Sequence, residues 1–277
     1  MTTPPRSWLF VPADSDKKVA KAIVSAADAI IFDLEDSVVP ERKAAARALL
    51  KGLGPRGGGP RWWVRINPIG SDAHKDDLEL LALSDVEGIV LPKAESGADI
   101  IQLSHRTGNI PIHAIVTETA ASLFGLLSYR DAKSPLVAMS WGAEDLSSAL
   151  GASSKYEASG ELAFTYRLAR SLCLAGAVAA GVQPVDGVFA DFRDEQGLTK
   201  EARAAAAEGF TGKLAIHPAQ VAPINAAFTP SPEEIAHARA IIAAFDADLQ
   251  AGVLSIDGKM VDRPHLIQAQ RVIERIR

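Results

Sequence analysis

The sequence predicts an α/β fold: a (β/α)8 TIM barrel followed by a C-terminal helical extension that includes a lid segment. Short apolar or β-branched runs alternate with segments of helical periodicity at a spacing of about 25 residues, as in parallel βα units. Eight such units suggest a closed barrel. An open doubly wound sheet would normally carry a glycine-rich phosphate-binding motif after its first strand, and "FVPADSD" is not one.

Eight continuous apolar runs are the expected strands, at residues 7–12, 29–35, 61–67, 88–93, 111–118, 136–142, 186–192 and 213–218. The segments between them have apolar residues at helical spacing, most clearly at 16–27, 41–53, 76–83, 98–106, 120–129 and 164–181. The Gly/Pro cluster "KGLGPRGGGP" is expected to be a surface loop rather than a domain linker.

The segment "TPSPEE" at 229–234 is expected to end the barrel, because proline interrupts regular structure and Ser231 can cap the helix that follows. We therefore predict two units, the barrel at residues 1–228 and a C-terminal helix and lid segment at residues 229–277. The second unit begins with a long helical pattern at 232–252. Beyond it, Gly258 provides a flexible point, as a closing lid requires.

The composition is that of a globular chain with a sizeable core, since 48% of the 277 residues are hydrophobic and 23% are charged. With 29 basic and 34 acidic residues and no long block of like charge, nucleic acid is not an expected partner. No run of about 18 apolar residues could span a membrane, and "MTTPPRSWLF" lacks the apolar segment of a signal peptide. The single cysteine, Cys173, excludes an intrachain disulfide. We expect a cytoplasmic protein that does not bind membranes.

Polar residues gather where the expected strands end, which is where TIM barrels carry their chemistry. In chain order they are Asp33, Glu35, Asp36, Arg65, Asn67, Lys93, Glu118, Glu144, Asp145, Asp191 and His217. Carboxylates that converge on one barrel mouth repel one another unless a cation neutralises them. Glu118 and the two acids at 144–145 follow adjacent strands, which lie about 4.8 Å apart. Oxygen ligands without a His or Cys partner favour Mg²⁺, or Mn²⁺, over zinc, so we predict such a cation at this mouth.

Each of these residues also has a purely structural interpretation. Glu118 could be an acid in the first turn of a helix, and one of the two acids at 144–145 is expected to be one. Arg65 could form a plain ion pair with the acids of "DLED". Lys93 in "LPKAES" and His217 in "AIHPAQ" are better explained as structural residues.

Nine motifs run in order over almost the whole chain, and together they point to a family. They are "RSWLFVPA", "FDLEDSV", "VRINP", "LPKAES", "ETA", "SWGAEDL", "DFRDEQGL", "AIHPAQV" and "GKMVDRPHLIQAQR". With them the chain resembles the citrate lyase β-subunit-like proteins of the HpcH/HpaI aldolase superfamily, which also contains malyl-CoA, methylmalyl-CoA and citramalyl-CoA lyases. The motifs are much less specific for the substrate than for the family.

The resemblance implies roles for the acids and the arginine at the mouth. Glu118 in "ETA" and Asp145 in "GAED" match the metal ligands of such enzymes. Glu35 and Asp36 in "DLED" match residues that hold metal-bound waters. Arg65 in "VRINP" matches the residue that polarises the keto or hydroxyl oxygen beside the metal.

The resemblance also implies contacts with the rest of the substrate. The backbone N–H groups of Gly142, Ala143 and Asp145 would receive the substrate carboxylate, as an anion at a helix start. Phe10 and Lys21 match positions that contact the coenzyme A moiety.

The implied reaction is a Mg²⁺-dependent cleavage of a 3-hydroxyacyl-CoA thioester, such as malyl-, citramalyl- or citryl-CoA, into an acyl-CoA and a 2-oxoacid. Arg65 stabilises charge at the reacting oxygen. Asp262 in "GKMVD" matches the aspartate that moves the proton at the enolate carbon. In such enzymes this segment often closes over a neighbouring subunit's site, which implies a homo-oligomer, a trimer or a hexamer.

Three other functions stay open at this point. The chain could be the β subunit of a citrate lyase complex that acts on a citryl thioester of an acyl carrier protein. It could be a metal-dependent aldolase of the pyruvate type, which uses no thioester. From another class, it could be a barrel without catalytic activity that only binds a partner. The "GKMVD" segment favours the enzyme that acts on free coenzyme A thioesters.

Overall fold

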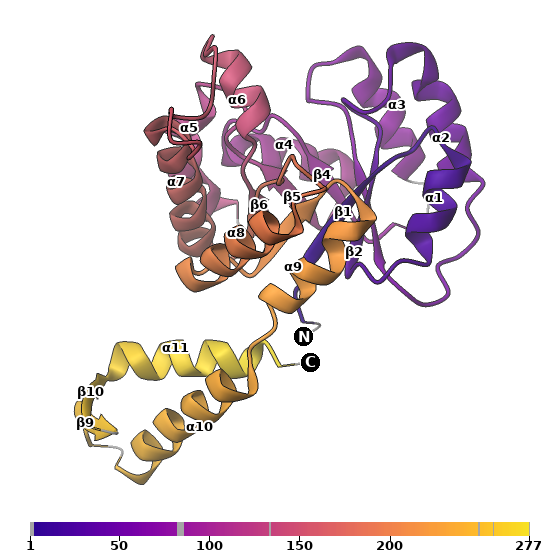
Figure 1. Ribbon diagram of the computed structural model, residues 1–277. Coiled ribbons are helices and arrows are strands. Elements are labelled where there is room, and N and C mark those ends of the chain that lie inside the picture. The colour runs from indigo at the N-terminus through magenta and orange to yellow at the C-terminus, as the bar shows by residue number, and fades with distance from the viewer. Residues whose placement is uncertain (1–2, 82–85, 133, 249, 257, 277) are drawn as a thin grey trace.

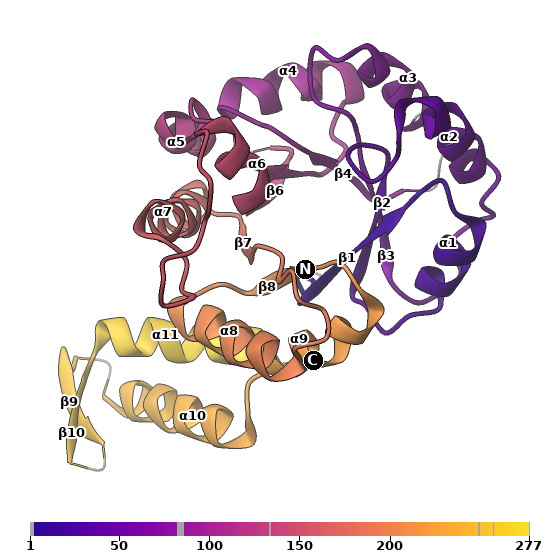
Figure 2. The same ribbon diagram turned by 45° about the horizontal axis from the view of Figure 1, so that its top comes forward.

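The computed structural model describes residues 3–81, 86–132, 134–248, 250–256 and 258–276. Eight parallel strands form a closed barrel, in which each strand pairs with the next along the chain and β8 pairs with β1. The strands are β1 (Ser7–Pro12), β2 (Ala29–Asp33), β3 (Arg61–Arg65), β4 (Gly88–Leu91), β5 (Ile112–Ile115), β6 (Leu136–Ser140), β7 (Gln183–Asp186) and β8 (Gly212–Ala215). The predicted (β/α)8 barrel is therefore confirmed (Figure 2).

Helices cover the outside of the barrel (Figure 2). They are α1 (Asp16–Ile23), α2 (Lys43–Lys51), α3 (Asp72–Leu81), α4 (Gly97–Thr107), α5 (Ser122–Gly125), α6 (Ala143–Ala149), α7 (Phe164–Ala180), α8 (Glu195–Glu208) and α9 (Val221–Ala227). Three short 3-10 helices lie among them, η1 (Pro40–Arg42), η2 (Leu126–Asp131) and η3 (Pro218–Gln220). The helix expected at 120–129 is thus split between α5 and η2, and the last two residues of the one expected at 76–83 lie outside the described residues.

Strand β7 differs most from its expected range of 186–192. It ends at Asp186, where Val185 and Asp186 pair with Gly212 and Lys213 of β8. The apolar residues after it lie in a loop instead, where Val188 and Phe189 are half-buried against the core and Phe192 is exposed. Apolar character alone did not separate this loop from a strand, because a short apolar run has no periodicity that distinguishes the two.

Apolar side chains fill the middle of the barrel interior, and most of the polar side chains lie at its ends. Alternate strand residues point inward, and among them Trp8 and Trp63 meet edge to face with ring centroids 5.0 Å apart. The other strand face packs against the helices; Ile30 and Phe32, for example, join Leu103 of α4 in one apolar cluster. Such filled interiors are typical of TIM barrels, whose functional groups lie at the carboxyl ends of the strands.

The chain after the barrel forms α10 (Pro232–Ala247), a hairpin of β9 (Val253–Ile256) and β10 (Lys259–Asp262), and α11 (Arg263–Glu274). We call these elements the extension. They share a small apolar core of their own and project from the barrel (Figure 1). Ser231 caps α10 as predicted, accepting a hydrogen bond from the N–H of Glu234 at 3.2 Å. Of the helices in the described part of the chain, none has the length and apolarity needed to cross a membrane.

Candidate active site

Asp33 and Arg65 form the base of the site because the barrel register places them side by side. They end the neighbouring strands β2 and β3, and their Cα atoms are register partners. The Arg65 guanidinium forms a bidentate ion pair with the Asp33 carboxylate, with Nε–Oδ1 at 2.7 Å and Nη2–Oδ2 at 2.6 Å. Burial alone would raise the pKa of Asp33, but the charge and hydrogen bonds of Arg65 outweigh it and lower that pKa. The guanidinium also stacks 4.7 Å from the ring centroid of Phe10.

Glu35 and Asp36 extend the acids beyond β2. The buried Glu35 has its Oε2 2.9 Å from Arg65 Nη1 without hydrogen-bond geometry, and no other described group satisfies this oxygen. Burial raises the pKa of Glu35, against the opposing effect of Arg65 and Lys93. Asp36 is more exposed and lies 4.0 Å from Arg65 Nη1. Lys43 holds the backbone of this loop through the Glu35 carbonyl at 3.1 Å.

Glu118 follows β5 and is only 4% exposed. Its Oε2 accepts a hydrogen bond of 2.6 Å from the backbone N–H of Lys93. Burial raises the pKa of this carboxyl to about 8, and the nearby charges of Asp145 and Glu35 act in the same direction. Gly142 leaves the space for it, since a Cβ there would lie 2.9 Å from the Glu118 Cγ.

The two acids after β6 face different ways. Both lie in the first turn of α6, which Gly142 precedes as N-cap. Glu144 is 62% exposed and pairs with Lys155, away from the other acids. Asp145 is 30% exposed and turns inward, with Oδ1 3.2 Å from Lys93 Nζ. The structure thus separates a surface acid from one that faces the site.

Lys93 lies at the centre of these acids. Its ammonium contacts Glu35, lies 3.2 Å from Asp145 and lies 3.6 Å from Asp36. The hydrogen bond that the ammonium donates to Glu35 and the charges of Glu35, Glu118 and Asp145 raise the pKa of Lys93, although burial opposes them. We refer to Asp33, Glu35, Asp36, Arg65, Lys93, Glu118 and Asp145 as the mouth cluster.

The mouth cluster fits a hard divalent cation that is bound partly by protein carboxylates and partly by water or substrate. All of its acidic groups present oxygen donors, and the buried Glu35 Oε2 lacks a hydrogen bond. Within the described residues, no group of three or more His, Cys, Asp or Glu side chains is arranged to hold a metal alone. Mg²⁺ typically takes one or two carboxylates and completes its shell with water and substrate oxygens. Glu118 and Asp145 can supply that pair.

The structure brings most of the predicted site residues together. The mouth acids, Arg65 and Phe10 converge, and the start of α6 adjoins them through Gly142. The N–H of Gly142 donates a long hydrogen bond of 3.3 Å to Thr117 Oγ1. The N–H groups of Ala143 and Asp145 lie in the first turn of α6, where backbone N–H groups have no intrahelical acceptor.

Two predicted residues lie elsewhere. Lys21 is exposed on the last turn of α1, the end of that helix remote from the carboxyl end of β1. Asp262 ends β10 and is the N-cap of α11, with Oδ1 2.5 Å from His265 Nδ1. It belongs to the extension, which projects away from its own barrel (Figure 1).

Three other residues expected at strand ends have structural roles. Asn67 donates from its backbone N–H at 2.8 Å and from Nδ2 at 2.6 Å to Oδ2 of the buried Asp77. Asp191 Oδ1 accepts a hydrogen bond of 3.0 Å from the backbone N–H of Arg193 within a turn. His217 caps η3 through the N–H of Ala219 at 3.2 Å and stacks on Phe192, with centroids 4.6 Å apart. The structural interpretation of His217 agrees with these contacts.

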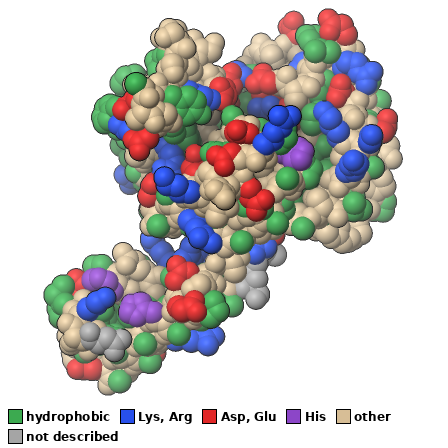
Figure 3. All heavy atoms as spheres, in the orientation of Figure 1, with side chains coloured by type: hydrophobic (Ala, Val, Ile, Leu, Met, Phe, Trp, Pro, Cys, Tyr) green, Lys and Arg blue, Asp and Glu red, His purple; other side chains and the backbone are tan. Residues whose placement is uncertain are grey.

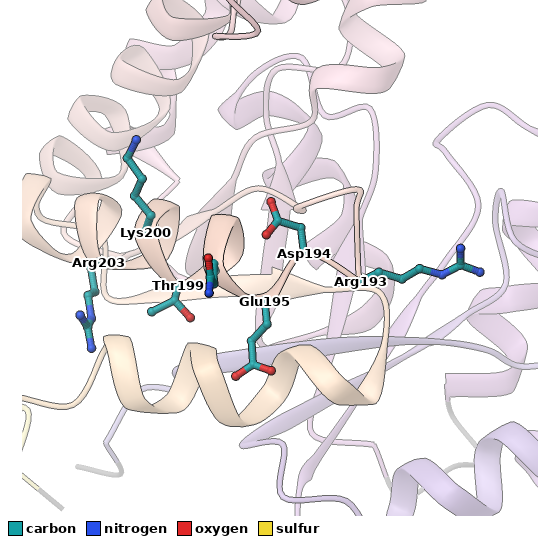
Figure 4. A pocket seen from close by; sticks show the side chains of 7 residues that line it. Arg193, Asp194, Glu195, Thr199, Lys200 and Arg203 are labelled. Carbon is teal, nitrogen blue, oxygen red and sulfur yellow. The ribbon is translucent and has the colours of Figure 1, made fainter.

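A surface hollow of about 860 Å³ lies along the start of α8, outside the mouth cluster (Figure 4). Its lining mixes both charges, from Arg193, Asp194, Glu195, Lys200 and Arg203. Asp194 caps α8 by accepting the N–H of Gly197 at 2.8 Å. Figure 3 shows acidic and basic side chains interspersed over this face of the barrel rather than a patch of one sign.

Two residues of the mouth cluster have contacts that the sequence patterns define only in part. Asp33 is one of the "DLED" acids with which Arg65 could form an ion pair, and the register that places the last residue of β2 beside the last residue of β3 identifies it as the partner. Lys93 was interpreted as structural, yet it contacts three of the mouth acids. The signal in the sequence was a cation that follows the strand directly before the one that ends in the acid of "ETA".

Three relatives align with nearly the whole chain. A citrate lyase subunit beta-like protein of Mycobacterium tuberculosis is 41% identical over 270 residues, 97% of this chain and 94% of that protein. A (3S)-malyl-CoA thioesterase of Cereibacter sphaeroides is 38% identical over 274 residues, 98% of this chain and 94% of that protein. The mitochondrial citramalyl-CoA lyase of Homo sapiens is 36% identical over 296 residues, 98% of this chain and 85% of that protein.

A solved structure agrees over the same length. The CitE protein of Mycobacterium tuberculosis in complex with magnesium, acetoacetate and coenzyme A is 40% identical, with a TM-score of 0.85, over 99% of this chain and 98% of that one. A family model described as HpcH/HpaI aldolase/citrate lyase matches residues 6–218, which include every residue of the mouth cluster. The chain therefore belongs to the HpcH/HpaI aldolase/citrate lyase family.

Proposed function

We propose that this protein is a Mg²⁺-dependent carbon–carbon lyase that cleaves a 3-hydroxyacyl-CoA thioester into an acyl-CoA and a 2-oxoacid. The observation that carries the proposal is the pair Glu118 and Asp145 at the barrel mouth, with the Arg65 guanidinium fixed beside them by Asp33. The names of relatives support it, since one is a citramalyl-CoA lyase and a solved relative holds magnesium and coenzyme A. Malyl-, citramalyl- and citryl-CoA are the substrates to test first.

A divalent cation held by Glu118 and Asp145 would supply Lewis-acid polarisation of the substrate's hydroxyl or keto oxygen. Arg65 donates from Nε and from Nη2 to Asp33, so its remaining N–H groups, including those of Nη1, can donate to that same oxygen. The N–H groups of Ala143 and Asp145 can receive the carboxylate. Glu35 and Asp36 lie where they can orient water molecules of the cation.

In the cleavage direction the substrate hydroxyl gives its proton to a water molecule, and the alcohol carbon becomes the carbonyl carbon of the 2-oxoacid. The electron pair of the broken C–C bond passes to the thioester, which becomes an enolate and takes a proton at carbon to give the acyl-CoA. Arg65 stabilises the charge at the developing carbonyl oxygen. We assign the proton transfer at carbon to Asp262 of a neighbouring copy.

The assignment of Asp262 includes a role for the extension. We propose that residues 229–277 form a lid over the barrel mouth of a neighbouring subunit, that residues 1–228 form the catalytic barrel, and that the protein is a homotrimer or a hexamer. Because the extension projects from its own barrel, its Asp262 is available to another copy (Figure 1). Exposed apolar side chains, such as Phe124 on α5 and Met260 on β10, provide surface for such contacts.

The coenzyme A contacts proposed from the sequence are Phe10 and Lys21. Phe10 lies against Arg65 at the mouth, so it can contact the thioester end of a substrate. Lys21 is exposed on α1 and could reach only the far, phosphate-bearing end of the coenzyme. A cytoplasmic location also stays a prediction from the sequence.

The test of the proposed function is cleavage of the three thioesters by the purified protein with Mg²⁺. Glu118→Ala and Asp145→Ala should each abolish Mg²⁺ binding and activity. Glu144→Ala is the matched control, because this neighbouring acid is exposed and pairs with Lys155. Wild-type activity and metal affinity in either mouth variant would show that the metal site is misplaced.

Asp262→Asn tests the proton-transfer step. Asparagine caps a helix as well as aspartate does, so the melting temperature should stay unchanged. Loss of an acid/base group should slow cleavage by about 10²–10⁴-fold, with little change in thioester or metal affinity. A fully active variant would contradict the role of Asp262 and would favour the carrier-protein or aldolase alternatives.

A second candidate function is hydrolysis of the thioester, since a relative at 38% identity is a (3S)-malyl-CoA thioesterase. The products separate the two reactions. Hydrolysis releases the free thiol of coenzyme A with an intact hydroxy acid, whereas the lyase releases a 2-oxoacid and leaves the thioester bond intact. Free thiol without 2-oxoacid would replace the lyase proposal by the thioesterase, and cleavage of citryl-carrier protein alone would replace it by a citrate lyase subunit.

A further inference from the structure

Lys93 combines an unusual backbone with a central position. It lies in the loop between β4 and α4 and has a φ of 52°, the sole positive φ of a non-glycine side chain in the described part of the chain. Residues with a Cβ are strained there, and such strain persists where the surroundings enforce it, often at functional sites. In this conformation the Lys93 N–H donates to Glu118 Oε2 at 2.6 Å.

The side chain of the same residue reaches the other acids. Its ammonium contacts Glu35 and lies 3.2 Å from Asp145 Oδ1. Arg65 is directed at Asp33 and Glu35 and has no ion pair with Asp145. In the described structure, the ammonium of Lys93 is thus the cation that neutralises Asp145.

A metal on the Asp145 oxygen that faces Lys93 would be in unfavourable contact with the ammonium. A Mg²⁺ ion binds a carboxylate oxygen at about 2.0–2.1 Å. With Lys93 Nζ 3.2 Å from the same oxygen, the two positive centres would be within a few ångströms of each other inside a partly buried pocket. Like charges at such a separation repel strongly, and the repulsion grows with burial.

We propose that Lys93 is the resident counter-ion of the metal-free mouth cluster and that its ammonium must leave Asp145 and Glu35 when a divalent cation binds. Its backbone N–H keeps holding Glu118 throughout, so the carboxylate stays in place while the positive charge is exchanged. Lys93 therefore weakens the intrinsic affinity for Mg²⁺. This inference rests on the proposed metal site at Glu118 and Asp145.

The first test measures Mg²⁺ binding by calorimetry without substrate. Lys93→Gln removes the charge and leaves a shorter polar side chain. It should bind Mg²⁺ about tenfold more tightly than the wild type, because the wild type must first break the ion pairs of Lys93 with Glu35 and Asp145. Lys93→Arg keeps the charge and should bind as weakly as the wild type. Lys51→Gln, an exposed lysine at the end of α2, is the control for net charge.

The second test uses the wild-type protein and does not depend on any variant folding. Acetylation of Lys93 by an amine-reactive reagent, followed by mass spectrometry, should increase when Mg²⁺ is added, while labelling of Lys51 should not. Unchanged or reduced labelling of Lys93, or an affinity of Lys93→Gln at or below that of the wild type, would overturn the proposal.

The failure of the metal site itself has a different signature. If Glu118→Gln and Asp145→Asn bind Mg²⁺ like the wild type, the proposed metal site is wrong, and the role of Lys93 falls with it. If those two variants lose Mg²⁺ while Lys93→Gln gains nothing, the metal site stands and only the counter-ion role is overturned.

Discussion

Two groups of buried charges lie at the ends of barrel strands, and they are built in opposite ways. The mouth cluster surrounds Glu118 with further acids. The second group, which we call the wall cluster, consists of Trp141, Arg170, Asp186 and Lys213 on the helix side of β7. There Asp186 receives hydrogen bonds of 2.8 Å from each of the other three residues.

The difference between the clusters is their charge balance. In the wall cluster, burial would raise the pKa of Asp186, but the charges of Lys213 and Arg170 outweigh it and lower that pKa to about 2. In the mouth cluster, burial and neighbouring acids raise the pKa of Glu118 to about 8. A balanced cluster stabilises the fold as it stands, whereas an excess of buried negative charge is destabilising until a cation arrives. This contrast indicates which cluster has a function beyond structure.

The largest expected effect is on the wall cluster. Asp186→Asn removes the carboxylate that the buried Lys213 and Arg170 share. It leaves them only the more exposed Glu201 and Glu208, so the free energy of unfolding should fall towards the low end of about 3–5 kcal/mol. Urea unfolding measures this. The double variant with Lys213→Met should lose less than the two single variants together, because both partners of one ion pair are gone.

For this variant, Asp131→Asn is the control, since Asp131 is an exposed acid 3.9 Å from Arg130. If Asp186→Asn loses as little stability as the control, the wall cluster does not stabilise the fold as proposed.

Arg65→Lys should affect rate more than stability. A lysine cannot reproduce the planar fork that grips Asp33 and still donates to substrate. Losing one such donor typically costs about 2.7–4 kcal/mol of transition-state stabilisation. The measurement is kcat/KM for cleavage, with Arg167→Lys on the exposed face of α7 as control. A loss under about threefold, far below the usual cost of such a donor, would mean that Arg65 is only a structural ion pair.

The pH dependence of stability should separate the clusters by sign. The pKa of Glu118 in the folded protein lies above its ordinary 4.5, so without metal the free energy of unfolding should fall as pH rises from about 4.5 to 8. At about 1.4 kcal/mol per pKa unit, the fall is at most about 5 kcal/mol. Asp186 acts oppositely, because its lowered pKa gives stability that is lost only as pH falls from about 4 towards 2.

Glu118→Gln should remove the fall between pH 5 and 8, whereas Glu144→Gln, an exposed neighbour, should retain it. Chemical unfolding at a series of pH values in a chelating buffer measures this, and added Mg²⁺ should stabilise the wild type most at the upper end. A wild-type profile that is flat over this range would contradict the excess of buried negative charge at the mouth.

The smallest effect is expected from Gly142→Ala. The added Cβ would lie 2.9 Å from Glu118 Cγ and 3.1 Å from Oε1, so the flexible carboxylate must shift. Such overpacking costs about 1–3 kcal/mol, and we expect the low end, seen as a loss of about tenfold or less in Mg²⁺ affinity. Gly54→Ala, where a Cβ meets no atom within 4 Å, is the control. Unchanged affinity would mean that Glu118 does not need its present position.

Several features follow from the sequence alone, because they depend on patterns that local chemistry determines. The alternation of apolar runs and helical segments predicts the barrel, since each βα unit must bury one strand and one helix face. Acids at the ends of successive strands predict a charged mouth, because parallel strands place their carboxyl ends on the same rim. Ser231 as the cap of α10 follows from a three-residue spacing to Glu234. The family motifs are likewise present in the sequence itself.

Only the tertiary structure decided which charges face which. The pairing of Asp33 with Arg65 and the end of β7 at Asp186 depend on the register between neighbouring strands. Glu144 faces outward to Lys155 and Asp145 faces inward to Lys93, although the two acids are adjacent in the sequence. The reach of Lys93 across to Glu35 depends on a left-handed backbone at one residue. A long, flexible side chain has no periodicity that reveals its partner, and burial sets the pKa of a carboxyl through neighbours that the fold alone assembles.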